Sequence, residues 1–420
     1  MVRLIVGSGT PLCGSVNIQG AKNSALKLMA ATLLAEGTHH LSNVPEIVDV
    51  EIMSELLRSM GSSVQWEGVN RLVITTPAID GLLPRAPYEL VDRMRASIVV
   101  LGPLVARAGV AQVSLPGGDD FGHRPIDIHL DALSLMGADF KVSHGYVTGR
   151  SERLVGAEIV LEFPSHTATD NVLMAASLAS GETTITNAAK EPEVVDLAEM
   201  LKSMGARIDG AGTSTIRVVG TETLNCVSHE VIPDRVEAAT FMCALAVTGG
   251  EIELLGARRD QMEMLMRKLE RVGVDFVVSS SGILARSNGR PAASDIATLP
   301  YPGIATDYKP LLVAMLTVAD GVSIVTENLF AGRFRYIDEL RRMAANIQTE
   351  GHHVIVRGVG RLSGAQVKAP DIRAGAALVI AGLAAEGETI VSGVSHIDRG
   401  YERFEEKLTA LGANVERIDS

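Results

Sequence analysis

Aromatic residues and cysteine are scarce in this chain of 420 residues. Only 4% of its residues are aromatic, with a single tryptophan, whereas 46% are hydrophobic. The core must therefore be built from aliphatic side chains, and a hydrophobic content this high excludes a disordered chain. The three cysteines have no paired spacing. This argues against a disulfide framework or a zinc site, and it predicts ordinary buried thiols.

Long hydrophobic runs are also missing. The longest uncharged apolar stretch, residues 96–106, contains a proline and is far shorter than the roughly 20 residues that cross a bilayer. The N-terminal segment MVRLIVGSGT lacks the apolar region and cleavage site of a signal peptide. We therefore expect no membrane partner and a cytoplasmic location.

Positive charge is in deficit, since 38 basic residues stand against 50 acidic ones and give a formal net charge of −12. The resulting field repels polyanions, which argues against nucleic acid as a partner. An anionic substrate would need a local cationic pocket. At about 150 residues per domain, the length indicates two or three domains.

An internal repeat of about 70 residues fills the chain. One junction of an amphipathic helix with a strand recurs six times, as LLRSMGSSV, LSLMGADF, LKSMGARI, LERVGVDF, LRRMAANI and LTALGANV. Its turn positions are Gly61, Gly137, Gly205, Gly273, Ala344 and Gly412. A second junction, where an apolar helix ends before a strand, falls at Gly37, Gly109, Gly181, Gly249, Gly321 and Gly387. Glycine at these positions supplies the positive φ that ends a helix.

The two helices of each repeat differ in polarity. The first, for example NVLMAASLA, is apolar on nearly every face and is expected to be buried all round, whereas the second is amphipathic. This pattern predicts an α/β protein whose sheets enclose helices. Six repeats divide naturally into two domains of three, with a boundary near residue 230.

Charged residues interrupt the pattern at the starts of the buried helices and in the turns after the strands. The helix starts carry Lys22, Asn23, Arg95, Ser165, Asp170, Asp234, Arg235, Asp307, Asp371 and Arg373. The turns are LPGGDDFGHRP, TENLFAGRF and SHIDRGYERF. Helix N-termini bind anions, and arginine forks bind phosphate and carboxylate in a bidentate manner. The cations Lys22, Arg95, Arg124, Arg333, Arg373 and Arg399 thus favour an anion pocket over structural salt bridges, whereas Asn23, Thr169 and Asp371 taken alone favour helix caps.

The loop LPGGDDFGHRPIDIH is rich in glycine and indicates a lid. It carries the adjacent carboxylates Asp119 and Asp120 and also His123. In a closing, dehydrated loop one carboxyl can become a proton donor near neutrality, and the alternative is a solvated acidic turn. The segment GSGTPLCG lacks GxGxxG spacing, and the chain has no Walker loop, HExxH or GxSxG. A nicotinamide enzyme is therefore not expected.

Segments along nearly the whole chain resemble the enolpyruvyl transferase family. They are GAKNSALKLMAATLLAEG, MRASIVVLGPLVA, LPGGDDFGHRPIDIH, NAAKEPEVVD, IPDRVEAATF, TENLFAGRFRYIDEL, DIRAGAALVIAG and HIDRGYERFEEKL. The resemblance implies a two-domain inside-out α/β barrel of six βαβαββ repeats, with the active site in the interdomain cleft. The expected domains are 22–229 and 1–21 plus 230–420.

The resemblance also implies a reaction that needs no cofactor and no metal. Enolpyruvyl would pass from phosphoenolpyruvate to the 3′-hydroxyl of UDP-N-acetylglucosamine with release of phosphate, the first committed step of peptidoglycan synthesis. Lys22, Arg124 and Arg399 would hold phosphoenolpyruvate, near Asn23, Arg95 and Arg373. The nucleotide would contact Arg124, Pro125, Ile126, Asp127, Ile128, Ser165, His166 and Thr167. Asp307 and Leu329 would contact the sugar, Asp307 would act as base, and Arg333 and Asp371 would complete the binding set.

Several positions depart from the family pattern, and one of them is Val48, where many relatives have lysine. Asp119 stands where most members have cysteine, so we expect it to be the general acid and expect insensitivity to the thiol-alkylating epoxide fosfomycin. His166 and Thr167 replace a common Val-Gly. The changed segment leaves open a paralogue with another acceptor, such as a different uridine nucleotide. A non-catalytic binding protein is the remaining alternative.

Overall fold

The structure, a computed structural model, describes residues 2–117, 126–330 and 332–419. The chain divides into two compact units. The first unit comprises residues 20–117 and 126–232, and the second comprises residues 2–19 and 233–419. Each unit encloses its own aliphatic core. The chain therefore passes from one unit to the other twice, after residue 19 and after residue 232.

The described residues form six four-stranded sheets, three in each unit, and one two-stranded sheet of β22 and β24, and the six larger sheets share one plan. In each of these six sheets one outer strand pairs in parallel with its neighbour, and the remaining pairs are antiparallel, as in the order β6-β7-β9-β8. Along the chain the order is strand, buried helix, strand, amphipathic helix and two further strands. This βαβαββ order confirms the repeat that the spacing of the turns predicted.

The elements of the first unit begin at the start of the first buried helix. They are α1 (Lys22–Ala31), β3 (Gly37–Ser42), α2 (Val48–Ser59), β4 (Ser63–Trp66), β5 (Arg71–Thr76), β6 (Arg85–Ala86), α3 (Tyr88–Val91), η3 (Arg95–Val100), α4 (Leu101–Ala108), β7 (Val110–Ser114), α5 (Asp127–Leu135), β8 (Asp139–Ser143), β9 (Tyr146–Arg150), β10 (Glu158–Val160), α6 (His166–Ala176), β11 (Glu182–Thr186), α7 (Pro192–Ser203), β12 (Arg207–Asp209), β13 (Thr215–Val219) and β14 (Ser228–Glu230).

The second unit contains the two N-terminal strands and the C-terminal half of the chain. Its elements are β1 (Arg3–Val6), β2 (Leu12–Asn17), α8 (Arg235–Thr248), β15 (Gly250–Leu255), α9 (Glu263–Arg271), β16 (Val274–Val278), β17 (Gly282–Ser287), β18 (Ile296–Ala297), α10 (Lys309–Leu316), β19 (Val322–Thr326), α11 (Tyr336–Arg342), β20 (Asn346–Glu350), β21 (His353–Arg357), β22 (Leu362–Ser363), β23 (Gln366–Lys368), α12 (Ile372–Leu383), β24 (Ala385–Glu386), β25 (Thr389–Ser392), α13 (Val394–Asp398), α14 (Phe404–Ala410) and β26 (Val415–Ile418).

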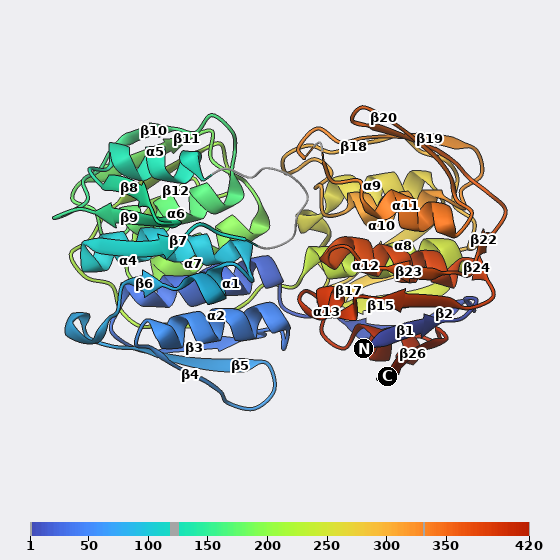
Figure 1. The fold of residues 1–420 in the computed structure, drawn as a ribbon, viewed down its shortest axis with the longest axis horizontal. Helices are drawn as coiled ribbons and strands as arrows, with labels where there is room; N and C mark the ends of the chain where they lie inside the picture. The colour runs from blue at the N-terminus through green and yellow to red at the C-terminus, as the bar shows by residue number, and fades with distance from the viewer. Residues whose placement is uncertain (1, 118–125, 331, 420) are drawn as a thin grey trace. The chain divides into compact units, whose positions relative to one another are not determined.

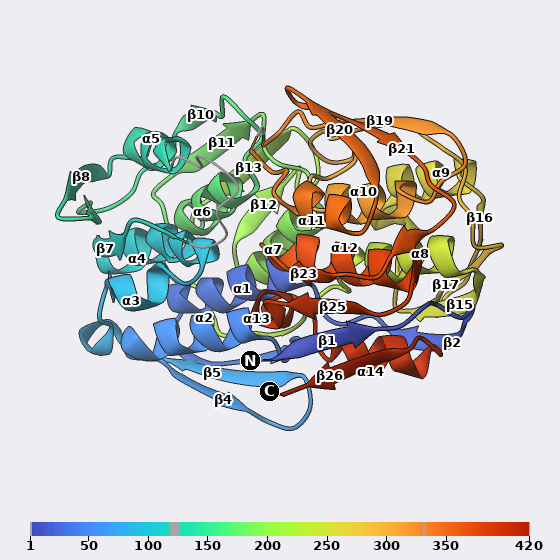
Figure 2. The same cartoon turned by 45° about the vertical axis from the view of Figure 1, so that its right-hand side comes forward.

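The apolar helices lie inside each unit, as their uniform hydrophobicity predicted. In the second unit α8, α10 and α12 pack against one another, between the sheet of β19 and β21 on one side and the sheet of β1 and β26 on the other (Figures 1 and 2). Every residue of α12 is buried. A helix without a polar face can be stable only in such surroundings, so the sheets necessarily form the outer layer.

Three strands complete sheets far from their place in the sequence. β2 precedes α1 in the chain but pairs in parallel with β15, and β14 precedes α8 but pairs in parallel with β3. β1 lies between β25 and β26, antiparallel to both. The first and last strands of the chain therefore belong to the same sheet.

The glycine junctions have the backbone geometry that the sequence predicted. All twelve turn positions have positive φ, including the single non-glycine residue, Ala344, at 65°. The cysteine prediction is wrong for Cys13 and Cys226, which are exposed, and holds for Cys243. Cys13 lies on the outward side of β2, where strand alternation carries it away from the core. Within the described ranges, no helix is both long enough and apolar enough to cross a membrane.

Candidate functional site

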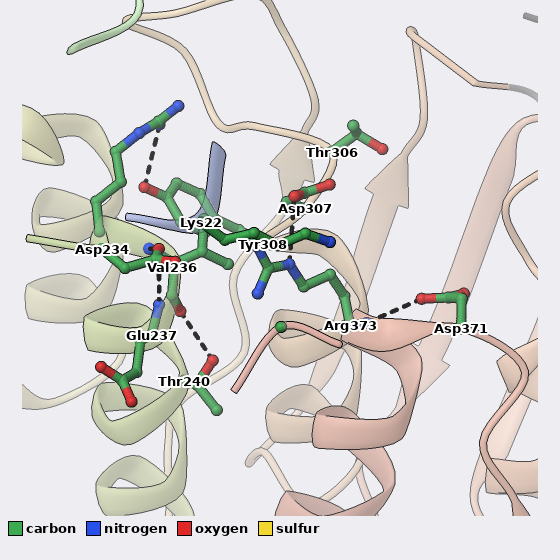
Figure 3. Close-up of polar contacts among 12 residues, drawn as sticks. Lys22, Asp234, Val236, Glu237, Thr240, Thr306, Asp307, Tyr308, Asp371 and Arg373 are labelled. Carbon is green, nitrogen blue, oxygen red and sulfur yellow. Dashed lines mark hydrogen bonds and ion pairs between the residues drawn. The ribbon is translucent and has the colours of Figure 1, made fainter. Parts of the chain in front are cut away.

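In the second unit, the buried helix α12 starts at a predicted site residue. Asp371 is its N-cap, because Oδ1 accepts the backbone N–H groups of Arg373 at 2.9 Å and Ala374 at 3.0 Å (Figure 3). Asp234 caps α8 in the same way. The capping explanation therefore applies to Asp371, and it places Arg373 in the first turn of a helix whose N-terminus favours anions.

Asp307 is held between two buried guanidinium groups from different repeats. Its Oδ1 lies 2.7 Å from Arg333 Nη1. Its Oδ2 lies 3.3 Å from Arg373 Nε (Figure 3). The arginine side chains are 3% and 4% exposed, whereas the Asp307 side chain is 28% exposed. The Asp307 carboxylate thus faces outward, with the two positively charged guanidinium groups buried beneath it. Arg373 Nη1 is buried with no hydrogen-bond partner among the described residues.

Neighbouring groups keep both guanidinium groups charged, because they raise the pKa values of Arg333 and Arg373. Burial disfavours the charged form of Arg333, but Asp307 and Asp371 outweigh it and raise its pKa. Burial also opposes the charge of Arg373, and here Tyr401 and Asp307 outweigh it and raise the pKa. Asp307, Arg333 and Arg373 were each predicted as site residues, and the structure brings these three together.

A fully buried ion pair that was not predicted as part of the site lies in the repeat that contains Asp307 and Arg333. Lys309 Nζ is 2.8 Å from Glu327 Oε2, and both side chains are completely buried. Glu327 also accepts the hydroxyls of Thr298 and Thr306 and the backbone N–H of Leu329, at 2.7, 2.8 and 2.8 Å. A buried carboxylate with this many partners fixes the turn after β19 that carries Leu329.

Burial and the opposite charge of the partner shift the pKa values of both Lys309 and Glu327. Burial lowers the pKa of Lys309 to about 8, with Glu327 opposing that shift. Burial opposes ionisation of Glu327, but Lys309 outweighs it and lowers the carboxyl pKa. Lys309 also donates to the backbone carbonyl of Arg333 at 2.7 Å. A charged residue at the start of an otherwise apolar helix was the signal that could have singled out Lys309.

Arg399, the remaining predicted cation of this unit, directly follows α13 and is half-buried.

The ring of Tyr401 lies 5.3 Å below the guanidinium of Arg373. The Tyr401 hydroxyl in turn shares a 2.9 Å hydrogen bond with Thr240. Stacking on an aromatic face adds cation–π stabilisation and fixes the plane of the fork.

The first unit carries its predicted cations at helix starts. Lys22 opens α1 and pairs with Asp49 Oδ2 at 2.7 Å, and Asp49 is nearly completely buried in α2. Arg95 opens η3 and is half-buried. The capping explanation is wrong for Asn23, because the N-cap of α1 is Ala21 and Asn23 lies one residue inside the helix.

The start of α6 is capped by Ser165, whose Oγ accepts the N–H of Ala168 at 3.4 Å. Thr169 is not a cap, because its hydroxyl donates to the carbonyl of Ser165 at 2.8 Å from within the helix. His166 and Thr167 occupy the exposed side of the first turn and are half-buried. Ile126 is buried directly before α5, and Asp127 and Ile128 form the first turn of that helix.

A third unpredicted residue, Lys27, contacts two residues of the first turns of α6. Its Nζ lies 2.9 Å from Asp170 Oδ2 and contacts His166 Nε2. Burial raises the pKa of Asp170 to about 7, and Lys27 opposes that shift. The N-terminus of α6 is therefore supported by a buried lysine in addition to its own dipole.

Several predicted residues fall outside the described ranges. They are Asp119, Asp120, His123, Arg124 and Pro125. The lid, the proton donor and the role of Arg124 therefore stay predictions.

The chain matches a family model along most of its length. The model is that of EPSP synthase (3-phosphoshikimate 1-carboxyvinyltransferase), and it matches residues 6–408. A protein of Corynebacterium jeikeium named UDP-N-acetylglucosamine 1-carboxyvinyltransferase is 49% identical, over 99% of this chain and 98% of its own length. A protein of Mycobacterium tuberculosis with the same name is 48% identical, over 99% of both chains.

Solved structures agree with this assignment. The enolpyruvyl transferase NikO from Streptomyces tendae superposes with a TM-score of 0.89 at 25% identity, over 99% of this chain and 98% of its own. EPSP synthase from Acinetobacter baumannii has a TM-score of 0.79 at 20% identity over both full lengths, a likeness of fold. The predicted α/β fold class of βαβαββ repeats is thus confirmed, as is the resemblance noted in the sequence. This chain belongs to the EPSP synthase family of enolpyruvyl transferases.

Proposed function

We propose that this chain transfers the enolpyruvyl group of phosphoenolpyruvate to the 3′-hydroxyl of UDP-N-acetylglucosamine and releases phosphate, the first committed step of peptidoglycan synthesis. The observation that carries the proposal is the 48–49% identity, over nearly the full length, to relatives named for this reaction. Both substrates are small anionic molecules, and we place the reaction in the cytoplasm.

Asp307 is the proposed base for the acceptor hydroxyl. Arg333 and Arg373 each hold one of its oxygens, so the carboxylate keeps one orientation and offers its remaining lone pairs to a substrate hydroxyl. Two guanidinium groups also weaken a carboxylate as a base. Proton transfer would therefore be favoured when substrate binding draws an arginine toward a phosphate or carboxylate group.

The cations of both units are proposed to neutralise phosphoenolpyruvate. Lys22, Arg124 and Arg399 would bind it, with Asn23, Arg95 and Arg373 close by. Neutralisation removes the repulsion between the negative charges of phosphoenolpyruvate and the incoming hydroxyl oxygen. Asp119 then donates a proton to C3 while that oxygen, deprotonated by Asp307, attacks C2. The resulting tetrahedral intermediate then expels phosphate from C2 and loses one proton from C3, which returns to the Asp119 carboxylate, so that the C=C bond of the enolpyruvyl group is restored.

The nucleotide is proposed to bind at the starts of α5 and α6. Residues 124–128 and the segment from Ser165 to Thr167 would contact the uridine and the diphosphate, while Leu329 and Asp371 complete the contacts to the sugar side. Phosphate groups are favoured at the N-terminus of α6 because its backbone N–H groups and its dipole are positive there.

Phosphate release from phosphoenolpyruvate, measured with a panel of acceptors, tests the proposal. We expect release with UDP-N-acetylglucosamine and none with shikimate 3-phosphate. Release only with another uridine nucleotide would establish the paralogue, for which the replacement of Val-Gly by His166 and Thr167 is the specific support. No release with any acceptor would favour a binding protein.

Fosfomycin tests the assignment of Asp119 as the general acid. We expect the wild-type enzyme to be insensitive, because an aspartate offers no thiolate to open the epoxide. Asp119→Cys should become sensitive to covalent inactivation, and Asp119→Asn should lose turnover while substrate binding is largely kept. A covalent fosfomycin adduct on the wild-type loop, or full turnover by Asp119→Asn, would move the acid role to another residue.

A further inference from the structure

A chain of buried hydrogen bonds leads from α4 into α6, and its first link fixes the orientation of one amide. The N–H of Gly102 donates to Asn171 Oδ1 at 2.7 Å, and Asn171 Nδ2 donates to the carbonyl of Ile98 at 3.1 Å. Gly102 N can only donate and Ile98 O can only accept, so the amide oxygen and nitrogen of Asn171 are assigned without ambiguity.

The second link fixes the tautomer of a histidine. The other hydrogen of Asn171 Nδ2 points to His129 Nδ1, 2.9 Å away, so Nδ1 is an acceptor. Burial, assisted by the charge of Arg95, lowers the pKa of His129 to about 4, and the ring is neutral near pH 7. A neutral imidazole that accepts at Nδ1 carries its proton on Nε2.

The third link determines what the hydroxyl of Thr167 can do. His129 Nε2 lies 3.3 Å from Thr167 Oγ1, so the ring N–H donates and the hydroxyl oxygen accepts. The proton of that hydroxyl is then available to another group. Thr169, two residues on, donates its proton back to the Ser165 carbonyl, whereas the described residues offer no such acceptor to Thr167. Thr167 is thus oriented as a donor in the half-buried first turn of α6.

We propose that Thr167 is a specificity-determining residue whose hydroxyl donates to a diphosphate oxygen of the acceptor, and that His129 and Asn171 are positioning residues that act through it. The inference rests on the proposed function and deepens it. A phosphate oxygen is an acceptor only, which matches a hydroxyl held as a donor. The N-terminus of α6 favours negative charge at the same place.

Thr167→Val tests the donor, because valine keeps the shape of threonine and removes the hydroxyl. Loss of one hydrogen bond to a charged group should raise KM for UDP-N-acetylglucosamine by about tenfold. The kcat and the KM for phosphoenolpyruvate should change by less than about twofold, because uniform acceptor binding is lost and the chemical step is untouched. The matched Thr167→Ser retains the donor and should stay close to wild type.

His129→Phe tests the relay. Without the Nε2 proton the Thr167 hydroxyl loses its fixed orientation, so KM for the acceptor should rise by several fold, to no more than the value of Thr167→Val. In the double variant His129→Phe/Thr167→Val, the second substitution should add nothing, because both act on one interaction. Affinity for UDP alone, measured by calorimetry, should fall in parallel, since UDP retains the diphosphate and lacks the sugar.

The outcomes separate this inference from the proposed function. If wild type uses UDP-N-acetylglucosamine and Thr167→Val keeps its KM, the inference is overturned alone. Additive effects in the double variant would overturn the positioning role of His129, and an unchanged UDP affinity would reassign the contact to the sugar and overturn the diphosphate assignment. A wild-type enzyme that does not use UDP-N-acetylglucosamine would overturn the proposed function and the inference with it. Thr167 is half-buried, and the Thr167→Val test does not depend on folding of the His129 variant.

Discussion

At the scale of the residue, burial shifts the pKa of single carboxyl groups, and Glu237 is an example. Glu237 on α8 is fully buried, with Oε1 2.7 Å from Lys407 Nζ and Oε2 2.7 Å from the backbone nitrogen of Gln19. Burial raises the pKa of Glu237 to about 7, and Lys407 opposes that shift. Gln19 is the last residue before the chain leaves the second unit, so this carboxyl anchors the crossing point.

Glu237→Gln should change how stability depends on pH. The folded carboxyl holds its proton up to about pH 7, whereas an unfolded glutamate releases it near the ordinary value of 4.5. Since the folded state binds more protons in that window, the contribution of Glu237 to the free energy of unfolding falls as pH rises from about 4.5 to 7. Urea unfolding should show the variant gaining on wild type between pH 5 and pH 8. The exposed Glu406→Gln should show no such trend, and a constant difference for Glu237→Gln would contradict the assignment.

The residues of the candidate site were only partly predictable. Asp307, Arg333 and Arg373 were singled out because charge interrupts apolar helix starts and turns. Lys309 and Glu327 occupy the same segments but were overlooked, since a sequence does not say which neighbouring charge turns inward. Their pairing depends on the packing of a helix against the turn that follows β19.

At the scale of the element, one local feature recurs at every repeat: the helix ends in a residue with positive φ. Capping was less predictable. Asp371 and Ser165 cap their helices, but Asn23 and Thr169 lie inside theirs. Polar residues cluster within a few positions of each helix start, and the cap is whichever one retains extended backbone, which packing decides.

Ala344→Gly should stabilise the protein. At a φ of 65°, alanine bears the steric cost of the left-handed region, about 1–2 kcal/mol, and glycine does not. The entropy that glycine loses on folding offsets part of this, so we expect a net gain of about 0.5–1 kcal/mol in chemical denaturation. Gly412→Ala, at the equivalent turn of the next repeat, should lose stability. Destabilisation by Ala344→Gly would contradict this explanation of the turn.

At the scale of the whole molecule, the excess of acidic residues and the cationic site are compatible because they occupy different depths. The formal charge is −12, yet Arg333, Arg373 and Lys309 are buried, and each of them is paired with a carboxylate. The net charge of the chain therefore reflects its exposed residues and does not indicate the local charge of the site. Buried cations that are paired with carboxylates contribute little to the long-range field.

Leu4→Ala should destabilise the second unit and spare the first. Leu4 is completely buried in β1, which joins the two ends of the chain in one sheet. Its truncation should cost about 2–5 kcal/mol. The core of the first unit contains no residue before Ala25. Hydrogen exchange followed by mass spectrometry should show faster exchange only in the second unit, in residues 2–19 and 233–419. The exposed Arg3→Ala is the matched control, and equal effects on both units would contradict independent cores.

Local chemistry alone determined the repeat, the burial of the apolar helices and the positive φ of the turns, because each depends on residues within one short segment. Only the tertiary structure decided which strands β1, β2 and β14 pair with. It also decided that Arg333 and Arg373 both bind Asp307. The same holds for the hydrogen bonds that lead through Asn171 and His129 to Thr167. These contacts join residues that are far apart in the sequence. Their partners are selected by the packing of whole helices and sheets, and no pattern within a single segment encodes that choice.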